Sequence, residues 1–152
     1  MAPAAQGAEL AAALRALLLD TGPLAAYLDR RDPAHEEIAT CLAAFSGQLH
    51  TTSAVITEAM HFVAADSRGP ALLAEFITAS RTLVHDLSQP AELRAAAALM
   101  AKYADTPMDY ADATLLLLAE RLGVPHIVTL DRRGFSVYRT RKGKAMRIFN
   151  RS

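Results

Sequence analysis

Leu17-Leu18-Leu19-Asp20-Thr21-Gly22 is the stretch around which the rest of the chain is arranged. A short apolar run that ends in an acid and a glycine is typical of a buried strand, here residues 17–20, followed by a turn. Pro23 suits the first turn of a helix, because its missing N–H is not needed there. The stretch therefore places the Asp20 carboxylate where a strand meets a helix, either as a helix cap or as part of a site.

Strands and helices are expected to alternate along the rest of the chain. From apolar spacing, Pro and Gly positions and cap residues, we expect further strands over residues 48–52, 81–87, 126–131 and 145–149. Helices are expected over residues 23–28, 32–47, 53–65, 70–77, 91–103 and 109–122, with Ser53 as the cap of the third. This alternation predicts a three-layer α/β/α sandwich with a central, mainly parallel sheet. Residues 16–152 should form this single domain, preceded by a poorly ordered extension over residues 1–15.

The composition excludes several classes of protein. A chain of 152 residues buries a sizeable core without disulfides. Its single cysteine, Cys41, excludes a disulfide framework or a cysteine zinc cluster and is interpreted as a small core residue. No apolar run approaches the roughly 20 residues that a bilayer requires. The alanine-rich start resembles neither a secretory signal nor a transit peptide, so we expect a soluble, cytoplasmic protein without membrane contact.

The charges are unevenly distributed although the formal net charge is zero. All 16 acidic residues lie at or before Asp131, whereas half of the 16 basic residues follow it. One interpretation is that the basic tail brings a polyanionic partner to an acidic site. The alternative is a solvated tail that neutralises the acidic body.

Four acids lie near the expected carboxyl ends of strands or the starts of helices: Asp20, Glu58, Asp112 and Asp131. In open parallel sheets, the working site lies outside the carboxyl ends of the strands. Each of three acids also has a structural interpretation: Asp20 as a cap, Glu58 as a solvated helix edge and Asp131 as a turn residue. The four acids therefore form a candidate site only if they converge.

Asp112 is the acid that is hardest to explain structurally. Its helical neighbours Leu115, Leu116 and Ala119 form an apolar surface, and burying an unpaired carboxylate is costly. Asp109 lies one turn earlier, so this helix carries two acids that call for a cation. At about 6 Å spacing and an effective dielectric near 20, four carboxylates repel by ~15 kcal/mol in total. A domain that is stable by about 5–15 kcal/mol cannot tolerate this repulsion uncompensated.

The ligand types select the metal and the chemistry. The five histidines show no ligand spacing and are interpreted as structural. Oxygen donors alone favour Mg²⁺ or Mn²⁺ over zinc. Metals held by carboxylates suit phosphodiester hydrolysis, because they activate water and neutralise charge on the attacking and leaving oxygens.

Four motifs in this order resemble those of the PIN-domain ribonucleases, specifically the VapC-type toxins of bacterial and archaeal toxin–antitoxin pairs. They are Leu-Leu-Leu-Asp20-Thr-Gly-Pro-Leu, Thr57-Glu58-Ala, Met108-Asp109-Tyr-Ala-Asp112-Ala-Thr-Leu and Thr129-Leu-Asp131-Arg-Arg-Gly-Phe135. Together they cover residues 16–150, so the resemblance extends over nearly the whole chain. It implies an endoribonuclease dependent on Mg²⁺ or Mn²⁺, acting as a homodimer and blocked by a VapB-like antitoxin.

The resemblance also implies roles for individual residues. The catalytic, metal-binding acids would be Asp20, Glu58, Asp112 and Asp131, and the auxiliary residues Asp109, Thr129 and Thr21. Thr129 would orient an acid or a metal-bound water. Our hypothesis for the basic tail is that it contacts the RNA backbone beside the metal site, through Arg132, Arg133, Arg139, Arg141, Lys142, Lys144 and Arg147.

Three other functions fit part of the sequence. The opening motif also resembles the active-site turn of retroviral-type aspartic proteases, but those are all-β and the long Ala/Leu helices contradict them. A haloacid-dehalogenase-like phosphatase requires a second Asp two residues after the first, where this chain has Gly22. A catalytically weak PIN-like module that binds RNA or a partner is the non-enzyme alternative, and the presence of all four acids argues against it.

Overall fold

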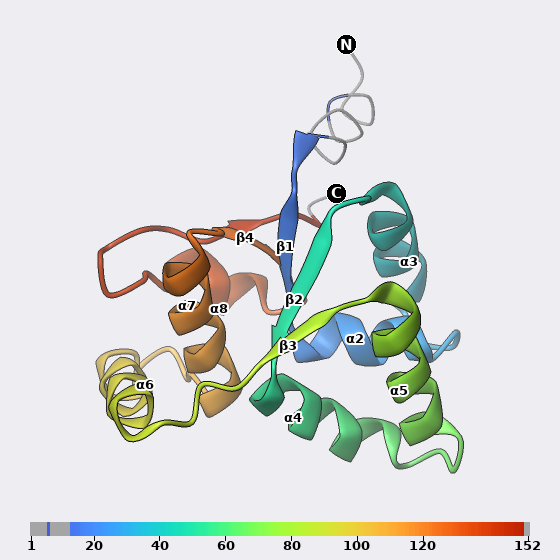
Figure 1. Cartoon of the computed structure of the whole chain (residues 1–152), viewed down its shortest axis with the longest axis horizontal. Coiled ribbons are helices and arrows are strands. Elements are labelled where there is room, and N and C mark those ends of the chain that lie inside the picture. The colour runs from blue at the N-terminus through green and yellow to red at the C-terminus, as the bar shows by residue number, and fades with distance from the viewer. Residues whose placement is uncertain (1–5, 7–12, 151–152) are drawn as a thin grey trace.

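The computed structural model describes residue 6 and residues 13–150 (Figure 1). Most of the expected extension over residues 1–15 lies outside these residues. The strands are β1 (Ala16–Leu19), β2 (Gln48–Thr52), β3 (Leu83–His85), β4 (His126–Val128) and β5 (Arg147–Ile148). The helices are α2 (Thr21–Leu28), α3 (His35–Ala44), α4 (Ser53–Val63), α5 (Gly69–Ser80), α6 (Pro90–Lys102), α7 (Tyr110–Leu122) and α8 (Arg132–Val137).

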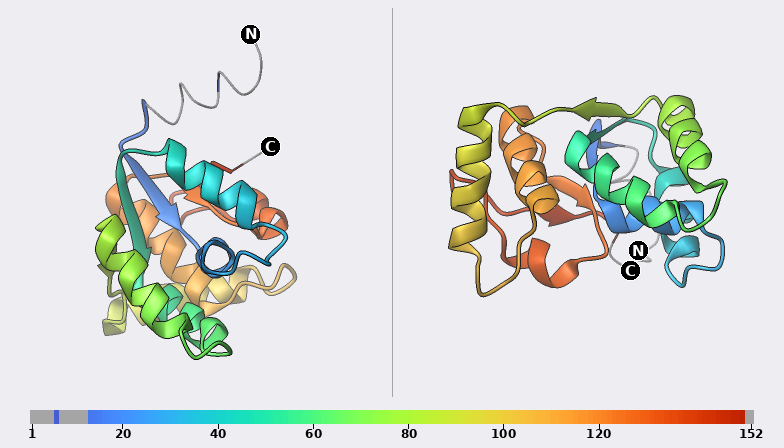
Figure 2. Two further views of the ribbon diagram at one scale, coloured as in Figure 1. Left: turned by 90° about the vertical axis from the view of Figure 1, so that its right-hand side faces the viewer. Right: turned by 90° about the horizontal axis from the view of Figure 1, so that it is seen from below.

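The strands form one parallel sheet in the order β3-β2-β1-β4-β5. Leu18 of β1 pairs with His50 on one side and with Ile127 on the other, so β1 is the central strand. Helices α2, α3 and α5 lie on one side of the sheet, and α6 and α7 lie on the other (Figures 1 and 2). The expected three-layer α/β/α sandwich is confirmed, and all of its described strand pairs are parallel.

The core is formed by strand β1 together with helix α7. Leu17, Leu18 and Leu19 are fully buried, which explains why an unbroken apolar run precedes Asp20. Helix α7 is buried at every position over residues 111–119, as its nearly uniform apolar sequence predicts. It ends at Gly123, whose φ of 66° suits glycine. The C-terminal end of β1 and the N-terminal end of α7 both lie at the carboxyl edge of the sheet.

Several boundaries differ from the sequence predictions. Strand β4 ends at Val128 and not at Asp131, because residues 129–131 leave the ladder to reach helix α8, which was not expected. The predicted cap Ser53 is wrong, since the Thr52 hydroxyl accepts the hydrogen bond from Val55 N at 3.2 Å. Cys41 is only partly buried and packs at the margin of the core.

Two further features bear on the predictions. Helix α3 begins at His35 and not at Asp32, because the Asp32 carboxylate accepts a hydrogen bond from Ala34 N at 2.8 Å and forms a turn first. Among the described residues, no helix has the length and apolar character needed to span a membrane.

Candidate active site

Acids from separate segments of the chain meet in one pocket of about 450 Å³ at the carboxyl edge of the sheet. Figure 2 (right) shows the molecule from the side on which β1 ends and α2 and α7 begin. The lining residues are Asp20, Thr21, Gly22, Glu58, Pro107, Met108, Asp109, Asp112 and Asp131. We call this the acid pocket. The structure therefore brings together all four predicted acids, the auxiliary Asp109 and Thr21.

Three of these acids cap the helices that begin at the pocket. Asp20 accepts a hydrogen bond from Thr21 N at 2.8 Å, at the start of α2. Asp131 accepts one from Gly134 N at 3.0 Å, at the start of α8. Asp109 caps α7 in the same way. Because helix N-termini carry partial positive charge, they favour carboxylates there. The capping interpretation of Asp20 is thus correct, and the same side chain also lines the pocket.

Asp109 and Asp112 form a reciprocal pair at the start of α7. Asp112 N donates to the Asp109 carboxylate at 2.8 Å, and Asp109 N donates to the Asp112 carboxylate at 3.1 Å. Asp112 is only 8% exposed. The expectation that Asp112 needs a cation was therefore incomplete, since a backbone N–H already meets part of its need. The mutual repulsion of the neighbouring carboxylates is not removed by these bonds.

Thr129 connects Asp20 to Asp131. Its hydroxyl donates to Asp20 Oδ2 at 2.7 Å and accepts from Asp131 N at 3.0 Å. The buried Asn150 holds Thr129 in turn, because Thr129 N donates to Asn150 Oδ1 at 3.0 Å and Asn150 Nδ2 donates to Thr129 O at 2.9 Å. Sequence reasoning missed Asn150, and a lone asparagine near the end of the chain carries no pattern that would have identified it.

Burial disfavours the ionised form of the carboxyl groups in the acid pocket. It raises the pKa of Asp20 to about 6, opposed by the hydrogen bond from Thr129. Burial raises the pKa of Glu58 to about 7, and the charges of Asp109 and Asp20 add to the rise. Burial likewise raises the pKa of Asp112 to about 8, with repulsion from Asp20 and Asp109 adding to it. Near neutral pH the pocket therefore favours bound protons or a bound cation.

The donor set fits a hard divalent cation by the type of its ligands. All the acids that line the pocket offer oxygen donors, as Mg²⁺ and Mn²⁺ prefer. The Thr21 hydroxyl is also buried there and has no hydrogen-bond partner within the described residues. As the side chains stand, no three His, Cys, Asp or Glu residues in the described chain are close enough to hold a metal. The capping bonds explain this spacing, because they direct carboxylates toward backbone N–H groups.

The predicted RNA-binding residues are divided between two places. Arg132 and Arg133 directly follow Asp131, and the Arg132 guanidinium pairs with Glu37. In contrast, Arg141 and Lys142 line a different cavity, where Arg141 pairs with Glu120. Glu120 lies eight residues beyond Asp112 on α7, which corresponds to about 12 Å along the helix. The expectation that Arg141 and Lys142 lie beside the acid pocket is therefore wrong.

Arg139 lies between these two groups. Its guanidinium donates to the carbonyl oxygens of Ser136, Val137 and Tyr138, at 2.9–3.1 Å. It therefore closes the carboxyl end of α8, and the side chain is only partly exposed.

Three of the five histidines make structural contacts. His50 Nδ1 and His85 Nε2 are 2.9 Å apart and join β2 to the edge strand β3. His35 Nδ1 lies 3.0 Å from Ala26 O and joins α3 to α2. None of the described histidines lines the acid pocket. These contacts agree with the structural interpretation made from the sequence.

A parallel three-layer α/β/α fold with an acid pocket at its carboxyl edge defines a PIN-like domain. The chain is 32% identical over 126 residues to Ribonuclease VapC26 of Mycobacterium tuberculosis, which covers 81% of this chain and 92% of that protein. Among solved structures, VapC20 of M. tuberculosis, a sarcin–ricin-loop-cleaving toxin, matches with a TM-score of 0.69 and 17% identity. That match covers 76% of this chain and 90% of VapC20. No protein-family model matches the chain. This protein belongs to the VapC family of PIN-domain toxins.

Proposed function

We propose that this protein is an endoribonuclease toxin that hydrolyses RNA phosphodiester bonds at the acid pocket with the help of Mg²⁺ or Mn²⁺. The proposal is supported by its membership of the VapC family, in which nucleases generally depend on divalent metals. The observation that carries it is the convergence of Asp20, Glu58, Asp112 and Asp131 on one pocket, although they lie far apart in the sequence.

Each group at the pocket has a distinct part in this proposal. Asp20, Glu58, Asp112 and Asp131 would hold the cation, with Asp109 beside them. A bound divalent cation supplies charge neutralisation at the phosphate and lowers the pKa of water. Thr129 keeps Asp20 oriented through its 2.7 Å hydrogen bond.

Cleavage of RNA by the purified protein tests this proposal directly. We expect a labelled single-stranded RNA to be cut in Mg²⁺ or Mn²⁺, to stay intact in EDTA, and to be cut again when Mn²⁺ is restored in excess. This result follows because carboxylates alone neither neutralise the phosphate nor lower the pKa of water. Equal cleavage in EDTA and in Mn²⁺ would contradict the metal dependence, and intact RNA in every condition would contradict the activity.

The regulatory partners are part of the same proposal. We propose that the protein acts in the cytoplasm as a homodimer and is inhibited by a VapB-like antitoxin. In support, a cavity of about 700 Å³ lies next to the acid pocket, with which it shares Gly22, and the exposed side chain of Phe62 lines it. Exposed apolar surface of this kind is typical of protein–protein contacts. Light scattering should give twice the chain mass, and addition of the antitoxin should stop cleavage. A monomeric mass at micromolar concentration would overturn the homodimer.

Thr129→Val should reduce RNA cleavage by about 10–100-fold, the usual cost of losing a group that orients a metal ligand. Valine keeps the shape of threonine but cannot donate to Asp20 or accept from Asp131 N. The same hydrogen bond lowers the pKa of Asp20, so the acidic limb of the pH–rate profile should move to higher pH. Thr129→Ser should retain most of the activity and the original profile. A fall in rate without a shift of the profile would indicate a packing effect alone.

A further inference from the structure

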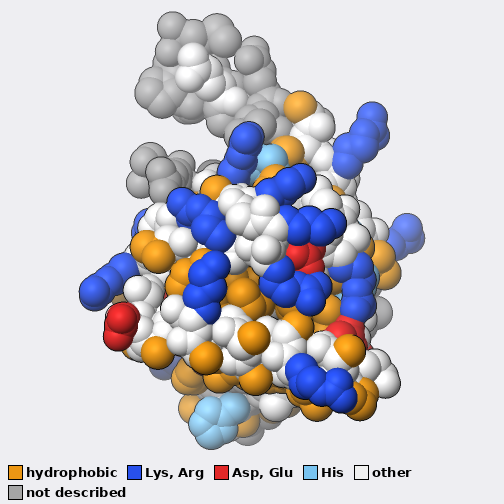
Figure 3. All heavy atoms as spheres, turned by 90° about the vertical axis from the view of Figure 1, so that its left-hand side faces the viewer, with side chains coloured by type: hydrophobic (Ala, Val, Ile, Leu, Met, Phe, Trp, Pro, Cys, Tyr) orange, Lys and Arg blue, Asp and Glu red, His pale blue; other side chains and the backbone are white. Residues whose placement is uncertain are grey.

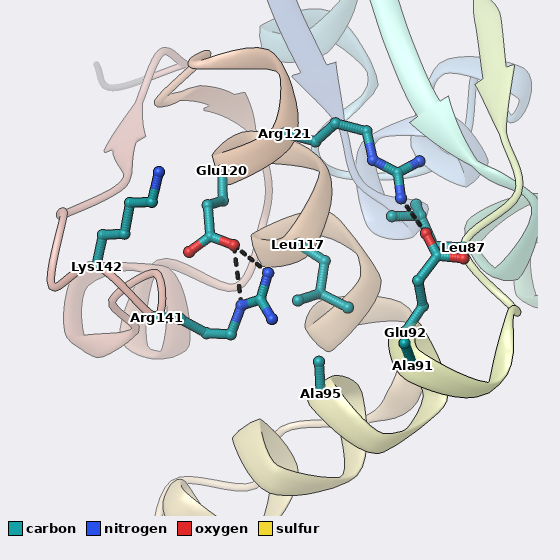
Figure 4. A pocket seen from close by; sticks show the side chains of 9 residues that line it. All are labelled: Leu87, Ala91, Glu92, Ala95, Leu117, Glu120, Arg121, Arg141 and Lys142. Carbon is teal, nitrogen blue, oxygen red and sulfur yellow. Dashed lines mark hydrogen bonds and ion pairs between the residues drawn. The ribbon is translucent and has the colours of Figure 1, made fainter.

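A further cavity, with basic side chains at its rim, lies between α6, α7 and the segment 139–145 (Figure 4). We call it the α6–α7 cavity. It has a volume of about 470 Å³ and is lined by Leu87, Ala91, Glu92, Ala95, Leu117, Glu120, Arg121, Arg141 and Lys142. Figure 4 shows Leu117 and Ala95 between the two helices, with charged side chains around them. The cavity thus combines an apolar floor with a charged rim.

The charges of the α6–α7 cavity do not cancel. Arg121 pairs with Glu92, and Arg141 pairs with Glu120 through a bond from its Nε at 2.9 Å. Lys142 is left over, because it makes no ion pair with any other described residue. Lys144, two residues further, is exposed and likewise has no ion-pair partner in the described chain. Among the described residues, the cavity therefore has one lining cation without an acidic partner, Lys142, and Lys144 lines the adjoining cavity together with Lys142. Both exposed ammonium groups are accessible to an anion.

Figure 3 shows the side of the molecule that carries α6, α7 and the segment 139–145. Lys and Arg side chains are spread over this face, and few acids are visible among them. A surface on which basic side chains outnumber acidic ones attracts an extended polyanion. The face therefore fits a nucleic-acid backbone.

The chain itself connects this face to the acid pocket. The chain leaves the acid pocket at Asp131, and further along it the Tyr138 hydroxyl donates to Pro107 O at 2.8 Å. One residue later, Arg139 N donates to the Tyr103 hydroxyl at 2.8 Å, and Arg141 then reaches Glu120. Residues 131–141 therefore run along α7 from its N-terminal end to its C-terminal end. The distance of about 12 Å along this helix exceeds the span of one nucleotide, so an RNA strand in the acid pocket must extend over further nucleotides to reach the cavity.

We propose that the α6–α7 cavity, together with Lys142 and Lys144, is a second RNA subsite that holds backbone phosphates beyond the nucleotides bound in the acid pocket. The inference rests on the proposed ribonuclease function. An RNA is favoured over an acidic protein as the occupant, because Lys142 and Lys144 follow the part of the chain that leads from Asp131 in the acid pocket along α7. A strand that passes through the acid pocket meets them in sequence. Contacts of this kind raise affinity for long RNAs without reading their sequence.

Binding of RNAs of two lengths tests the subsite. Fluorescence anisotropy in EDTA would compare the double variant Lys142→Ala/Lys144→Ala with the matched double variant Arg15→Ala/Arg68→Ala, which removes two exposed charges elsewhere. For an RNA of about 12 nucleotides, we expect the lysine variant to reduce the slope of log affinity against log salt by about 1.4, or about 0.7 for each lost phosphate contact. For a dinucleotide, which reaches only the acid pocket, we expect no change.

The outcomes separate this proposal from the function on which it rests. If the two double variants bind the long RNA equally, the subsite is wrong, whatever the cleavage assay shows. If the lysine variant loses affinity equally for both RNA lengths, the lysines contact RNA at the acid pocket and the remote subsite is also overturned. Failure of the ribonuclease proposal would instead appear as intact RNA with the wild-type protein in Mn²⁺. Thermal melting of both variants at the wild-type temperature would show that the changes act on binding alone.

Discussion

Asp112→Asn is expected to abolish RNA cleavage, with a loss of at least about 10³-fold, and to leave the metal-free protein as stable as the wild type or more stable. Burial and the charges of Asp20 and Asp109 raise the pKa of Asp112 to about 8, so the ionised carboxylate is disfavoured in the folded state. Asparagine removes that charge, and its carbonyl oxygen still accepts the hydrogen bond from Asp109 N. Cleavage rates in Mn²⁺ and melting temperatures in EDTA measure the two effects.

Two further variants complete this test. Asp20→Asn should cause the same loss of cleavage, because Asp20 lines the same pocket. Asp105→Asn is the matched control, since Asp105 is an exposed acid on the connection between α6 and α7 that does not line the acid pocket. It should change neither cleavage nor stability. Cleavage by Asp112→Asn at the wild-type rate would remove the acid pocket from the mechanism.

Without metal, the protein should lose stability as the pH rises from about 4 to about 8. The folded state holds protons on Asp20, Glu58 and Asp112 at pH values where the unfolded chain has released them. The free energy of unfolding therefore falls with rising pH through this window. The raised pKa of Asp20 alone accounts for about 3 kcal/mol of this fall. Saturating Mn²⁺ should restore more stability at pH 8 than at pH 5, because it binds the deprotonated carboxylates.

Denaturant unfolding at a series of pH values, in EDTA and in Mn²⁺, measures this dependence. His50, His85 and His126 act in the opposite direction, because burial lowers their pKa values and the unfolded chain binds protons more readily there. The comparison of wild type with Asp112→Asn isolates the acids, since the histidines are common to both. The wild type should become less stable relative to the variant as the pH rises. A stability difference that is independent of pH would refute the raised pKa of Asp112.

The parts of the fold that sequence predicted correctly are those set by local patterns. The uninterrupted leucines of β1 and the apolar run of α7 predicted buried elements, and both are buried. The sequence left the convergence of the four acids as a condition, and the positions of Asp20, Glu58 and Asp131 agree with the rule that strands of a parallel sheet end at one edge. Asp112 follows helix α6 and not a strand, so this rule does not place it. That rule needs only the order of strands and helices, which hydrophobic periodicity supplies.

The parts that sequence reasoning missed depend on contacts between distant residues. Residues 129–131 have strand-like side chains, but the amide of Thr129 bonds to Asn150 and not to a neighbouring strand. Helix α8 contains Gly134, which disfavours a helix, yet only glycine fits there because a Cβ would meet the Asp131 carboxylate and the Tyr138 ring. The Thr129–Asn150 contact has no local signature, so the end of β4 could not be predicted, whereas the contacts of Gly134 are with the cap residues of its own helix.

Sequence reasoning proposed a helix cap for Asp20 but missed the capping bonds of Asp109 and Asp131 and the course of the basic tail. The repulsion argument treated the carboxylates as free, whereas Asp20, Asp109 and Asp131 accept bonds from helix N-termini. Charge counting placed the whole tail beside the acids, whereas the segment after Tyr138 leads away along α7 to Glu120. A count of charges says nothing about the direction of the chain.

The position of Mn²⁺ in crystals of the wild-type protein, measured by anomalous scattering, tests the central claim most directly. We predict an Mn²⁺ peak in the acid pocket, bonded to carboxylate oxygens of Asp20 and Asp112, in protein that cleaves RNA under the same Mn²⁺ concentration. Binding should draw these carboxylates together from their positions in the metal-free fold. An acid pocket without an Mn²⁺ peak, in protein that cleaves RNA at that Mn²⁺ concentration, would contradict the assignment of the acid pocket as the metal-dependent nuclease centre.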